Sequence, residues 1–296
     1  MLKTNENKLV CQSMLGEITS PLGGINPYRI DPDGHADIYP GVGGITYNVR
    51  IGDAACGLFA DHVEPGVSIS NFTQFAGQPG PNRALNLFSC VGNVATLISG
   101  EAKGKKGRVT GKHGGIEHVL VDFEPEVLEL LAIGDKMQIR AFGCGLALAG
   151  HPDVKVLNLD PHLLQVMGIK EKKEGRIEVP VTHMVPARIM GSGIGSSQSN
   201  SGDYDIQLFD GPTVEEFGLG DLRLGDVVAI IDADASFGRI YKSGSIVIGI
   251  VVHSDCVLAG HGPGVMVAMS ARAEKLVPKI TAKANLKHYF EKMPKI

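Results

Sequence analysis

The sequence predicts a mainly β protein, built from several small barrel-like or sandwich units with few short helices. Its 39 Gly and 16 Pro among 296 residues are too many for long helices and are typical of short strands joined by tight turns. Two short apolar runs rich in β-branched residues, Val227–Ile231 and Ile246–Val252, predict strands of a buried sheet. Because Trp is absent and other aromatic residues are few, we expect a core of Val, Ile, Leu and Met.

The length predicts two domains, and we place the boundary near His151-Pro152. Residues 1–150 would form an N-terminal β-rich domain and residues 151–296 a C-terminal β-rich domain that ends in a helical tail rich in Lys, Ala271–Lys295. The net charge of -4 gives no overall attraction to nucleic acid or to acidic lipid. We therefore expect no binding to a membrane, and a nucleic acid is not the favoured partner.

Cysteine usage and the N-terminus predict a cytoplasmic protein. The first 15 residues are polar before their first apolar residues and lack the apolar stretch of a signal peptide. The five Cys form no CxxC pair, which favours buried reduced thiols over a disulfide framework or a zinc knuckle. The apolar composition and the Gly-rich segments between residues 16 and 86 suggest that the chain forms a homo-oligomer.

Within the N-terminal half, short apolar runs predict strands, and a Pro followed by acidic residues predicts a helix at Glu126–Ala132. His62 precedes a Glu-Pro-Gly turn and is expected to be a surface residue. The expected strands are Ile45–Ile51, Cys56–Ala60, Val94–Ser99, Ile116–Asp122 and Met137–Phe142.

A basic, Gly-rich loop joins the strands Val94–Ser99 and Ile116–Asp122. This segment resembles the strand–basic loop–strand part of small SH3-like barrels of ribosomal and elongation proteins. The loop can contact an anionic partner, or it can form a solvated hairpin at a sheet edge. The net negative charge of the chain favours the solvated hairpin. His113 and His118 are five residues apart across a Gly-Gly bend, so a shared metal ion is not the favoured interpretation. The cations of the loop are Lys103, Lys105, Lys106, Arg108 and Lys112.

In the C-terminal half, Asp160 and Pro161 predict a helix that ends at Gly168, and Thr213–Glu216 fits a single helical turn. The expected strands are Val154–Leu159, Ile177–Val181 and Val185–Met190, followed by the two apolar runs above. The segment Gly191–Gly202 is flexible by composition and can be a mobile lid or a phosphate cradle, although it lacks the Lys-Ser/Thr ending of a P-loop. We expect it to close over a site, with Gly193 and Ser196 binding substrate.

Ionisable residues follow the last buried strand and predict a functional site. His253, Asp255 and His261 lie in and beside a Gly-rich loop, Gly260–Gly264, in which Gly262 permits close approach of a ligand. Asp232 and Asp234 lie two apart on the preceding strand and are expected to project together as substrate-binding residues. The set can bind a divalent metal ion, can act as a metal-free acid–base site with Asp255 orienting His253, or can simply terminate strands.

Two functions fit these patterns. The first is hydrolysis of a small substrate at a C–N bond, with His253 as base, His261 binding a metal ion or an oxyanion, and residues 191–202 closing over the site. The second is a non-enzymatic binding or scaffold protein whose basic hairpin contacts nucleic acid or an anionic partner. Neither the metal nor any other cofactor is identified by the sequence.

Several stretches of the C-terminal half resemble an uncharacterised bacterial and archaeal family, described as a domain of unknown function with an N-terminal and a C-terminal part. The resemblance is specific for the family and implies no activity. The matching stretches are VPARIMGSG (185–193), DLRLGDVVAI (221–230), FGR (237–239) and VVHSDCVLAGHGPGV (251–265).

A fainter similarity connects the chain to the acetamidase/formamidase amidohydrolases, and it implies cleavage of an amide. It rests on the order Leu157–Asp160, Glu178–Val181, Val185–Ala187 and then Gly202-Asp203. Those enzymes have a Gly-Asp-Gly-Glu segment, whereas this chain has Gly202-Asp203-Tyr204-Asp205 and no Glu there.

Overall fold

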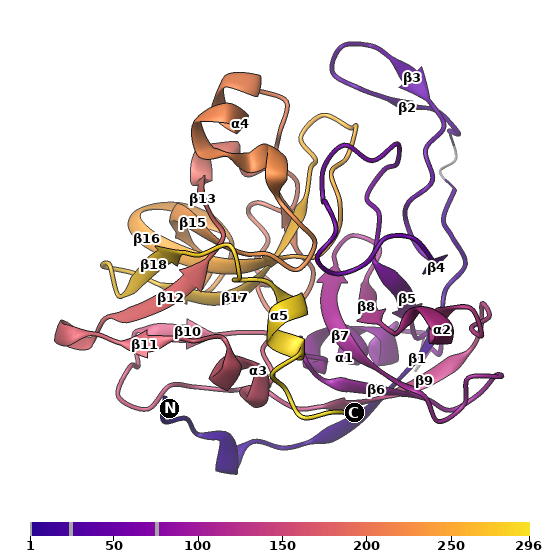
Figure 1. Cartoon of the computed structure of the whole chain (residues 1–296), viewed down its shortest axis with the longest axis horizontal. Helices are drawn as coiled ribbons and strands as arrows, with labels where there is room; N and C mark the ends of the chain where they lie inside the picture. The colour runs from indigo at the N-terminus through magenta and orange to yellow at the C-terminus, as the bar shows by residue number, and fades with distance from the viewer. Residues whose placement is uncertain (1, 24–25, 75–76) are drawn as a thin grey trace.

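A computed structural model describes residues 2–23, 26–74 and 77–296. The chain is mainly β with few short helices, as the sequence predicts, and its strands form a closed barrel and a second large sheet (Figure 1). The barrel takes its strands from residues 12–141, and the second sheet takes its strands from residues 154–271.

Six antiparallel strands close the barrel, in the order β1-β9-β6-β7-β8-β5, because β5 also pairs with β1. Inward side chains alternate with exposed ones along β9, as expected for a strand with one buried face. The interior is filled by aliphatic residues such as Val67, Ile69 and Ile139. The strands are β1 (Gln12–Ile18), β5 (Gly66–Ser70), β6 (Val94–Leu97), β7 (Lys106–His113), β8 (His118–Asp122) and β9 (Lys136–Ala141), with β4 (Ile45–Thr46) added beside β5.

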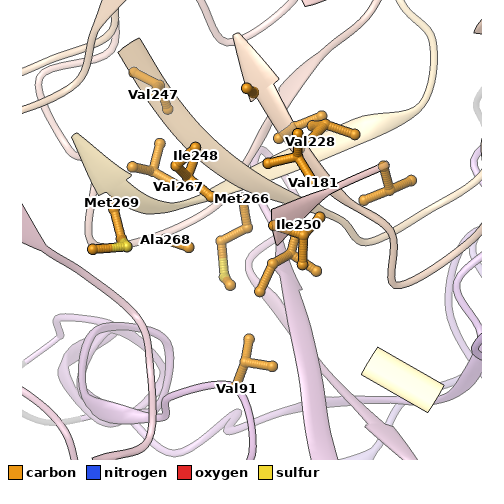
Figure 2. Close-up of a cluster of buried hydrophobic side chains, with 14 of the residues drawn as sticks. Val91, Val181, Val228, Val247, Ile248, Ile250, Met266, Val267, Ala268 and Met269 are labelled. Carbon is orange, nitrogen blue, oxygen red and sulfur yellow. The ribbon is translucent and has the colours of Figure 1, made fainter. Parts of the chain in front are cut away.

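The second sheet has the order β10-β17-β16-β15-β13, and β14 also pairs with β17. Every residue of β17 is buried, because both faces of this central strand are covered. Figure 2 shows the buried side chains of β16 and β17, with Val91 on the other side of the core. The strands are β10 (Val154–Val156), β13 (His183–Pro186), β14 (Tyr204–Asp205), β15 (Val227–Asp234), β16 (Ile240–Val251) and β17 (Gly264–Ala271).

The barrel strand β7 packs against β17, and Gly111 of β7 lies against Val252, the residue that follows β16. A Cβ atom at Gly111 would overlap the side chain of Val252, so a larger residue would force the two sheets apart. The register of β7 also shifts between Val109 and Gly111. The C-terminal end of β7 is thereby placed beside the end of β16.

Smaller elements surround the two sheets. Strands β11 (Lys170–Glu171), β12 (Ile177–Val181) and β18 (Leu276–Ile280) form one small sheet, and β2 (Arg29–Ile30) with β3 (Ala36–Asp37) forms a hairpin that projects from the body (Figure 1). The helices are α1 (Gly80–Phe88), α2 (Pro125–Leu128), α3 (Pro161–Val166), α4 (Gly211–Phe217) and α5 (Leu286–Phe290). The described residues include no helix of the length and apolarity needed to cross a bilayer.

The helix boundaries follow the capping residues. The Asp160 side chain accepts a hydrogen bond from the backbone N–H of His162 at 2.7 Å, which starts α3 as predicted. Asp210 caps the start of helix α4, and Gly218 follows its end with a φ of 63°, the left-handed conformation that glycine adopts readily.

Three expectations about elements are wrong. Residues 45–60 form only the two-residue strand β4, because Gly52 and Gly57 turn the chain with positive φ, whereas β5 was not anticipated. The expected helical tail is instead β18, which pairs in parallel with β12, followed by the short α5. Pro278 disfavours a helix there and is compatible with the edge position of β18.

Candidate functional site

A cleft of about 640 Å³ lies where the end of β7 meets loops of the second sheet. Its lining is rich in Gly, His and Asp, and it includes both ends of the segment 192–205. The His and Asp residues of this lining are Asp61, His62, His113, Asp203, Asp205 and His261.

His113 ends β7 and pairs directly across the hairpin with His118 on β8. Both imidazoles contact the wholly buried carboxylate of Glu64, at 2.5 Å from His113 Nδ1 and at 3.1 Å from His118 Nδ1. Burial alone would raise the pKa of Glu64, but the two imidazoles outweigh it and lower this pKa well below its usual range. Because Nδ1 of His113 is engaged by Glu64, its other ring nitrogen, Nε2, is available on the cleft side.

His253 follows the end of β16 and is completely buried. Its Nδ1 lies 2.8 Å from the carbonyl oxygen of Ser254, which favours the tautomer with a proton on Nδ1 and a lone pair on Nε2. Nε2 lies 2.7 Å from Asp203 Oδ2, yet the two groups are not aligned for a hydrogen bond. Within the described part of the chain, both atoms are buried without a hydrogen-bond partner, which is costly unless a ligand satisfies them.

Asp203 and Asp205 flank Tyr204 and therefore face the same side of β14. Asp203 Oδ1 accepts a hydrogen bond from the backbone N–H of Gly114 at 2.7 Å, which ties the barrel hairpin to the second sheet. Asp205 pairs with Gly264 on β17, and a Cβ at Gly264 would overlap both Asp203 Oδ2 and His253 Nε2. Only glycine at position 264 leaves room for Asp203 Oδ2 and His253 Nε2 to lie this close together.

His62 is buried, contrary to the expected surface position. Its backbone N–H donates to the carbonyl oxygen of Asp255 at 3.1 Å, and Ser254 N–H donates to Val63 at 3.0 Å, so this segment is docked onto the loop after β16. The ring Nδ1 lies 3.2 Å from Asp61 Oδ1, and Nε2 lies 3.2 Å from His261 Nδ1. His261 Nδ1 also contacts Asp205 Oδ2 at 3.1 Å, and about a third of the His261 side chain is exposed.

These side chains form two groups of potential metal ligands that share His253. One ligand atom each of His62, His113 and His253 lie within 4.8 Å of one another, and the same holds for Asp203, Asp205 and His253. The His113 and His253 rings are 4.2 Å apart between centroids. Imidazole and carboxylate donors suit Zn²⁺ and similar divalent ions, and Glu64 and the Ser254 carbonyl are the outer partners that commonly orient metal-bound histidines.

The electrostatics of the cluster favour bound positive charge. Burial disfavours charge on His62, but the neighbouring carboxylates of Asp205 and Asp61 outweigh this effect and raise the pKa of His62 to about 12. Burial raises the pKa of Asp203 and of Asp205, but the neighbouring imidazoles lower both below their usual values. A proton or a metal cation among these carboxylates would offset their negative charge in the same way.

The structure brings some of the predicted site residues together and separates others. His253 and His261 belong to the cluster, Gly193 and Ser196 line the cleft, and the N–H of Gly262 lies 3.3 Å from Asp205 Oδ2. Asp255 does not orient His253. Its Oδ2 accepts a hydrogen bond from Gly57 N–H at 2.8 Å, because the chain turns directly after His253.

Asp232 and Asp234 do not reach the cleft. The register of β15 shifts between Ile231 and Ala233, and Asp232 has a φ of 62°, so the two carboxylates do not follow the alternation of a regular strand. Asp232 accepts a hydrogen bond from Gly244 N–H at 2.8 Å, and Asp234 pairs with Arg272 at 2.6 Å. Both therefore stabilise the sheet at a distance from the site.

The segment 191–202 borders the cleft but is anchored at several points. The guanidinium of buried Arg239 donates to the carbonyl oxygens of Gly193, Ser201 and Asp203. The amine of Lys112 donates to the carbonyl of Asn200 at 2.9 Å. A segment rich in Gly and Ser is thus given a defined path by two buried cations.

Lys112 and Arg108 are buried, so only part of the basic hairpin faces solvent. Lys112 also donates to Asn158 Oδ1 at 2.8 Å, and burial lowers its pKa to about 8. Lys103, Lys105 and Lys106 remain exposed. Of the five cations that suggested an anionic partner, only these three lysines are exposed to solvent.

Four residues of the cluster were not predicted as site residues: His62, His113, Asp203 and Asp205. They come from segments separated by up to 143 residues in the chain, so sequence spacing alone carried no sign of their meeting. Two local signals existed. The His-Gly-Gly turn at residue 113 and the Asp-Tyr-Asp pattern of residues 203–205 both place donors at the end of a strand.

The chain is similar to known proteins over nearly its whole length. Residues 28–165 match the family described as domain of unknown function (DUF4438), N-terminal, and residues 166–290 match its C-terminal counterpart. A solved structure described as "Crystal structure of TM1086" is 48% identical, with a TM-score of 0.90, and the match covers 97% of this chain and 99% of that chain. No curated protein matches, so the similarity to acetamidase/formamidase stays a prediction. The chain therefore belongs to the DUF4438 family, whose two parts it carries in order.

Proposed function

We propose that this protein is a metal-dependent hydrolase that cleaves a C–N bond of a small substrate. The observation that carries the proposal is the convergence of His113 and His253 beside Asp203. The Nδ1 atoms of His113 and His253 already face an oxygen atom, which leaves their Nε2 atoms for a ligand. Asp203 Oδ2 and His253 Nε2 are buried and are not aligned for a hydrogen bond with each other. A bound cation would give both atoms a partner.

His113, His253 and Asp203 are the residues that we expect to hold the ion. A divalent ion in such a site activates water as a nucleophile at neutral pH and polarises a carbonyl group. Glu64 and the Ser254 carbonyl fix the two imidazoles in the required tautomer and orientation. His253 is therefore a metal ligand in this proposal and not the general base, because its Nδ1 contacts the Ser254 carbonyl and its Nε2 would bind the ion.

The cleft favours a small polar substrate. Its volume of about 640 Å³ is of the size that accommodates small molecules, and Gly114, Gly115 and Gly193 in its lining allow a ligand to approach the backbone. His261 lies on the exposed side with Nδ1 engaged by Asp205, so its doubly protonated form would donate a hydrogen bond from Nε2 to the departing nitrogen. Leaving groups with nitrogen need such assistance more than ester oxygens do.

The test is metal analysis and hydrolysis by the purified protein. We expect stoichiometric divalent metal, and release of ammonia or amine from at least one member of a panel of short-chain amides, ureides and cyclic imides. His113→Ala and His253→Ala should each lower metal affinity and turnover by at least about 100-fold. His288→Ala, on the outside of α5, is the matched control and should retain both. Wild-type metal content and turnover in His113→Ala would disprove the proposal.

We also propose that the protein works in the cytoplasm as a homo-oligomer. Its five cysteines are free thiols, although Cys11 and Cys144 are exposed and not buried as expected, and free thiols suit a reducing compartment. Large apolar side chains are exposed on and near the projecting β2–β3 hairpin, including Tyr28, Ile30 and Ile38, and a second copy of the chain would cover them. Light scattering of the purified protein measures the oligomeric state.

A further inference from the structure

The candidate metal centre has two sides that differ in exposure. The inner site consists of His113, His253 and Asp203. The outer site consists of His62, His261 and Asp205, and it faces the opening of the cleft, since His261 is the more exposed imidazole. The function proposed above needs an ion only in the inner site, so the outer site calls for an explanation of its own.

The outer site has the dimensions of a metal site. His62 Nε2 lies 3.2 Å from His261 Nδ1, which lies 3.1 Å from Asp205 Oδ2, and the remaining separation, His62 Nε2 to Asp205 Oδ2, is 3.8 Å. Two ligands of one tetrahedral Zn²⁺ with bonds near 2.0–2.1 Å lie about 3.3 Å apart. Asp61 contacts His62 Nδ1 at 3.2 Å, so His62 is oriented by a carboxylate as metal-bound histidines commonly are.

Asp205 connects the two sites. Its Oδ2 belongs to the outer site, whereas its Oδ1 lies 3.7 Å from His253 Nε2 of the inner site. The backbone N–H of Gly262 lies 3.3 Å from Oδ2 and helps to orient the carboxylate. A carboxylate with one oxygen in each site can bridge two ions at the separation of about 3.5–4 Å that is usual in two-metal hydrolases.

The charge of the cluster matches two divalent ions. Four buried carboxylates, Asp61, Glu64, Asp203 and Asp205, surround the two sites. The one Arg–carboxylate ion pair described among them joins Arg29 to Asp61 at 3.2 Å. Two divalent ions would balance the four carboxylates. A single ion would leave part of this charge to be offset by protons on the imidazoles and by buried Arg239.

Cys256 gives the outer site a softer character than the inner one. One ligand atom each of His62, Cys256 and His261 lie within 4.8 Å of one another. The Cys256 thiol now donates a hydrogen bond to Asp61 Oδ1 at 2.7 Å. A sulfur atom within reach of two imidazoles favours Zn²⁺ over the harder Mg²⁺ or Ca²⁺ at this position.

We propose that the outer site binds a second divalent ion, that Asp205 bridges it to the ion of the inner site, and that the hydrolase centre is binuclear. This inference rests on the proposed function for the inner ion. The second ion would lie on the exposed side, where a substrate enters, and would bind and polarise it there.

The test is a titration of chelator-treated protein with Zn²⁺ alone, followed by calorimetry and by elemental analysis after gel filtration. The wild-type chain should bind two ions, and His261→Ala and His62→Ala should each bind one. Anomalous diffraction at the zinc edge should show two peaks, one beside His253 and one beside His261. His288→Ala should bind two ions, as the wild type does.

A second control addresses the exposed hairpin, where Asp31, Asp33 and His35 form another group of potential donors. Asp33→Asn should leave the stoichiometry at two, and a fall to one would assign the second ion to the hairpin and overturn the inference. One ion per wild-type chain with intact turnover would overturn the binuclear centre and leave the proposed function standing. No bound ion and no metal-dependent turnover would overturn both. If His261→Ala fails to fold, the wild-type stoichiometry and the anomalous peaks decide.

Discussion

On the barrel side of the cleft, one carboxylate side chain orients two imidazoles, whereas on the opposite side the main chain orients His253. Glu64 contacts both His113 and His118, and it also accepts hydrogen bonds from Ser68 and from the backbone N–H of Gly43. His253 is oriented by the Ser254 carbonyl and lies against Gly264, where no Cβ fits. The barrel side therefore depends on one replaceable side chain, and the other side depends on the path of the backbone.

The largest effect is expected from Glu64→Ala, which removes the centre of the barrel side. Two buried imidazoles, a hydroxyl and a backbone N–H would lose their shared partner, so we expect the free energy of unfolding to fall by about 3–5 kcal/mol. Denaturant titration measures this change. Glu64→Gln preserves the volume and should cost less stability, yet it should weaken metal binding about 10–100-fold. Unchanged metal affinity in Glu64→Gln would show that His113 needs no such orientation.

Gly264→Ala tests the backbone-dependent side. The new Cβ would overlap Asp203 Oδ2 and His253 Nε2, so the strand must shift. We expect a loss of about 1–3 kcal/mol in stability together with loss of bound metal, measured by thermal unfolding and elemental analysis. The matched control is Gly220→Ala, where the nearest atom to a new Cβ is Val214 Cγ1 at 3.8 Å. Normal metal binding by Gly264→Ala would contradict the proposed ligand pair.

Asp234→Asn should have the smallest effect, because Asp234 belongs to the second sheet but not to the cleft. Hydrogen bonds from Ser236, Arg272 and Ser270 outweigh burial and lower the pKa of Asp234 to about 2. We expect a loss of about 1 kcal/mol in stability, with metal content and turnover unchanged.

The pH dependence of this loss has a definite sign. A carboxyl group with a lowered folded-state pKa contributes stability above its unfolded pKa of about 4, and the contribution disappears as the pH falls toward 2. The difference in unfolding free energy between wild type and Asp234→Asn should therefore be constant above about pH 5 and shrink below pH 4. A difference that grows at acid pH would contradict the assigned role of the ion pair.

The β-rich fold, several strands and helix α3 could be predicted because their signals are local. β-Branched runs such as Ile246–Val252 form strands wherever they are buried, and Asp160-Pro161 starts a helix through its own hydrogen bonds and dihedral angles. The expected helical tail failed because pairing of β18 with β12 is a long-range interaction. His253 and His261 were predicted since both lie near the end of one buried strand.

The sequence by itself determined the β-rich class, strands such as β16 and the start of helix α3, since these depend on each residue and its neighbours. Only the tertiary structure decided which polar side chains meet. His62, His113 and the pair Asp203 and Asp205 come from three separate segments, and barrel closure together with the packing of β7 against β17 places them beside His253. Such meetings depend on contacts between residues distant in the chain, for which the local pattern of a single sequence carries no signal.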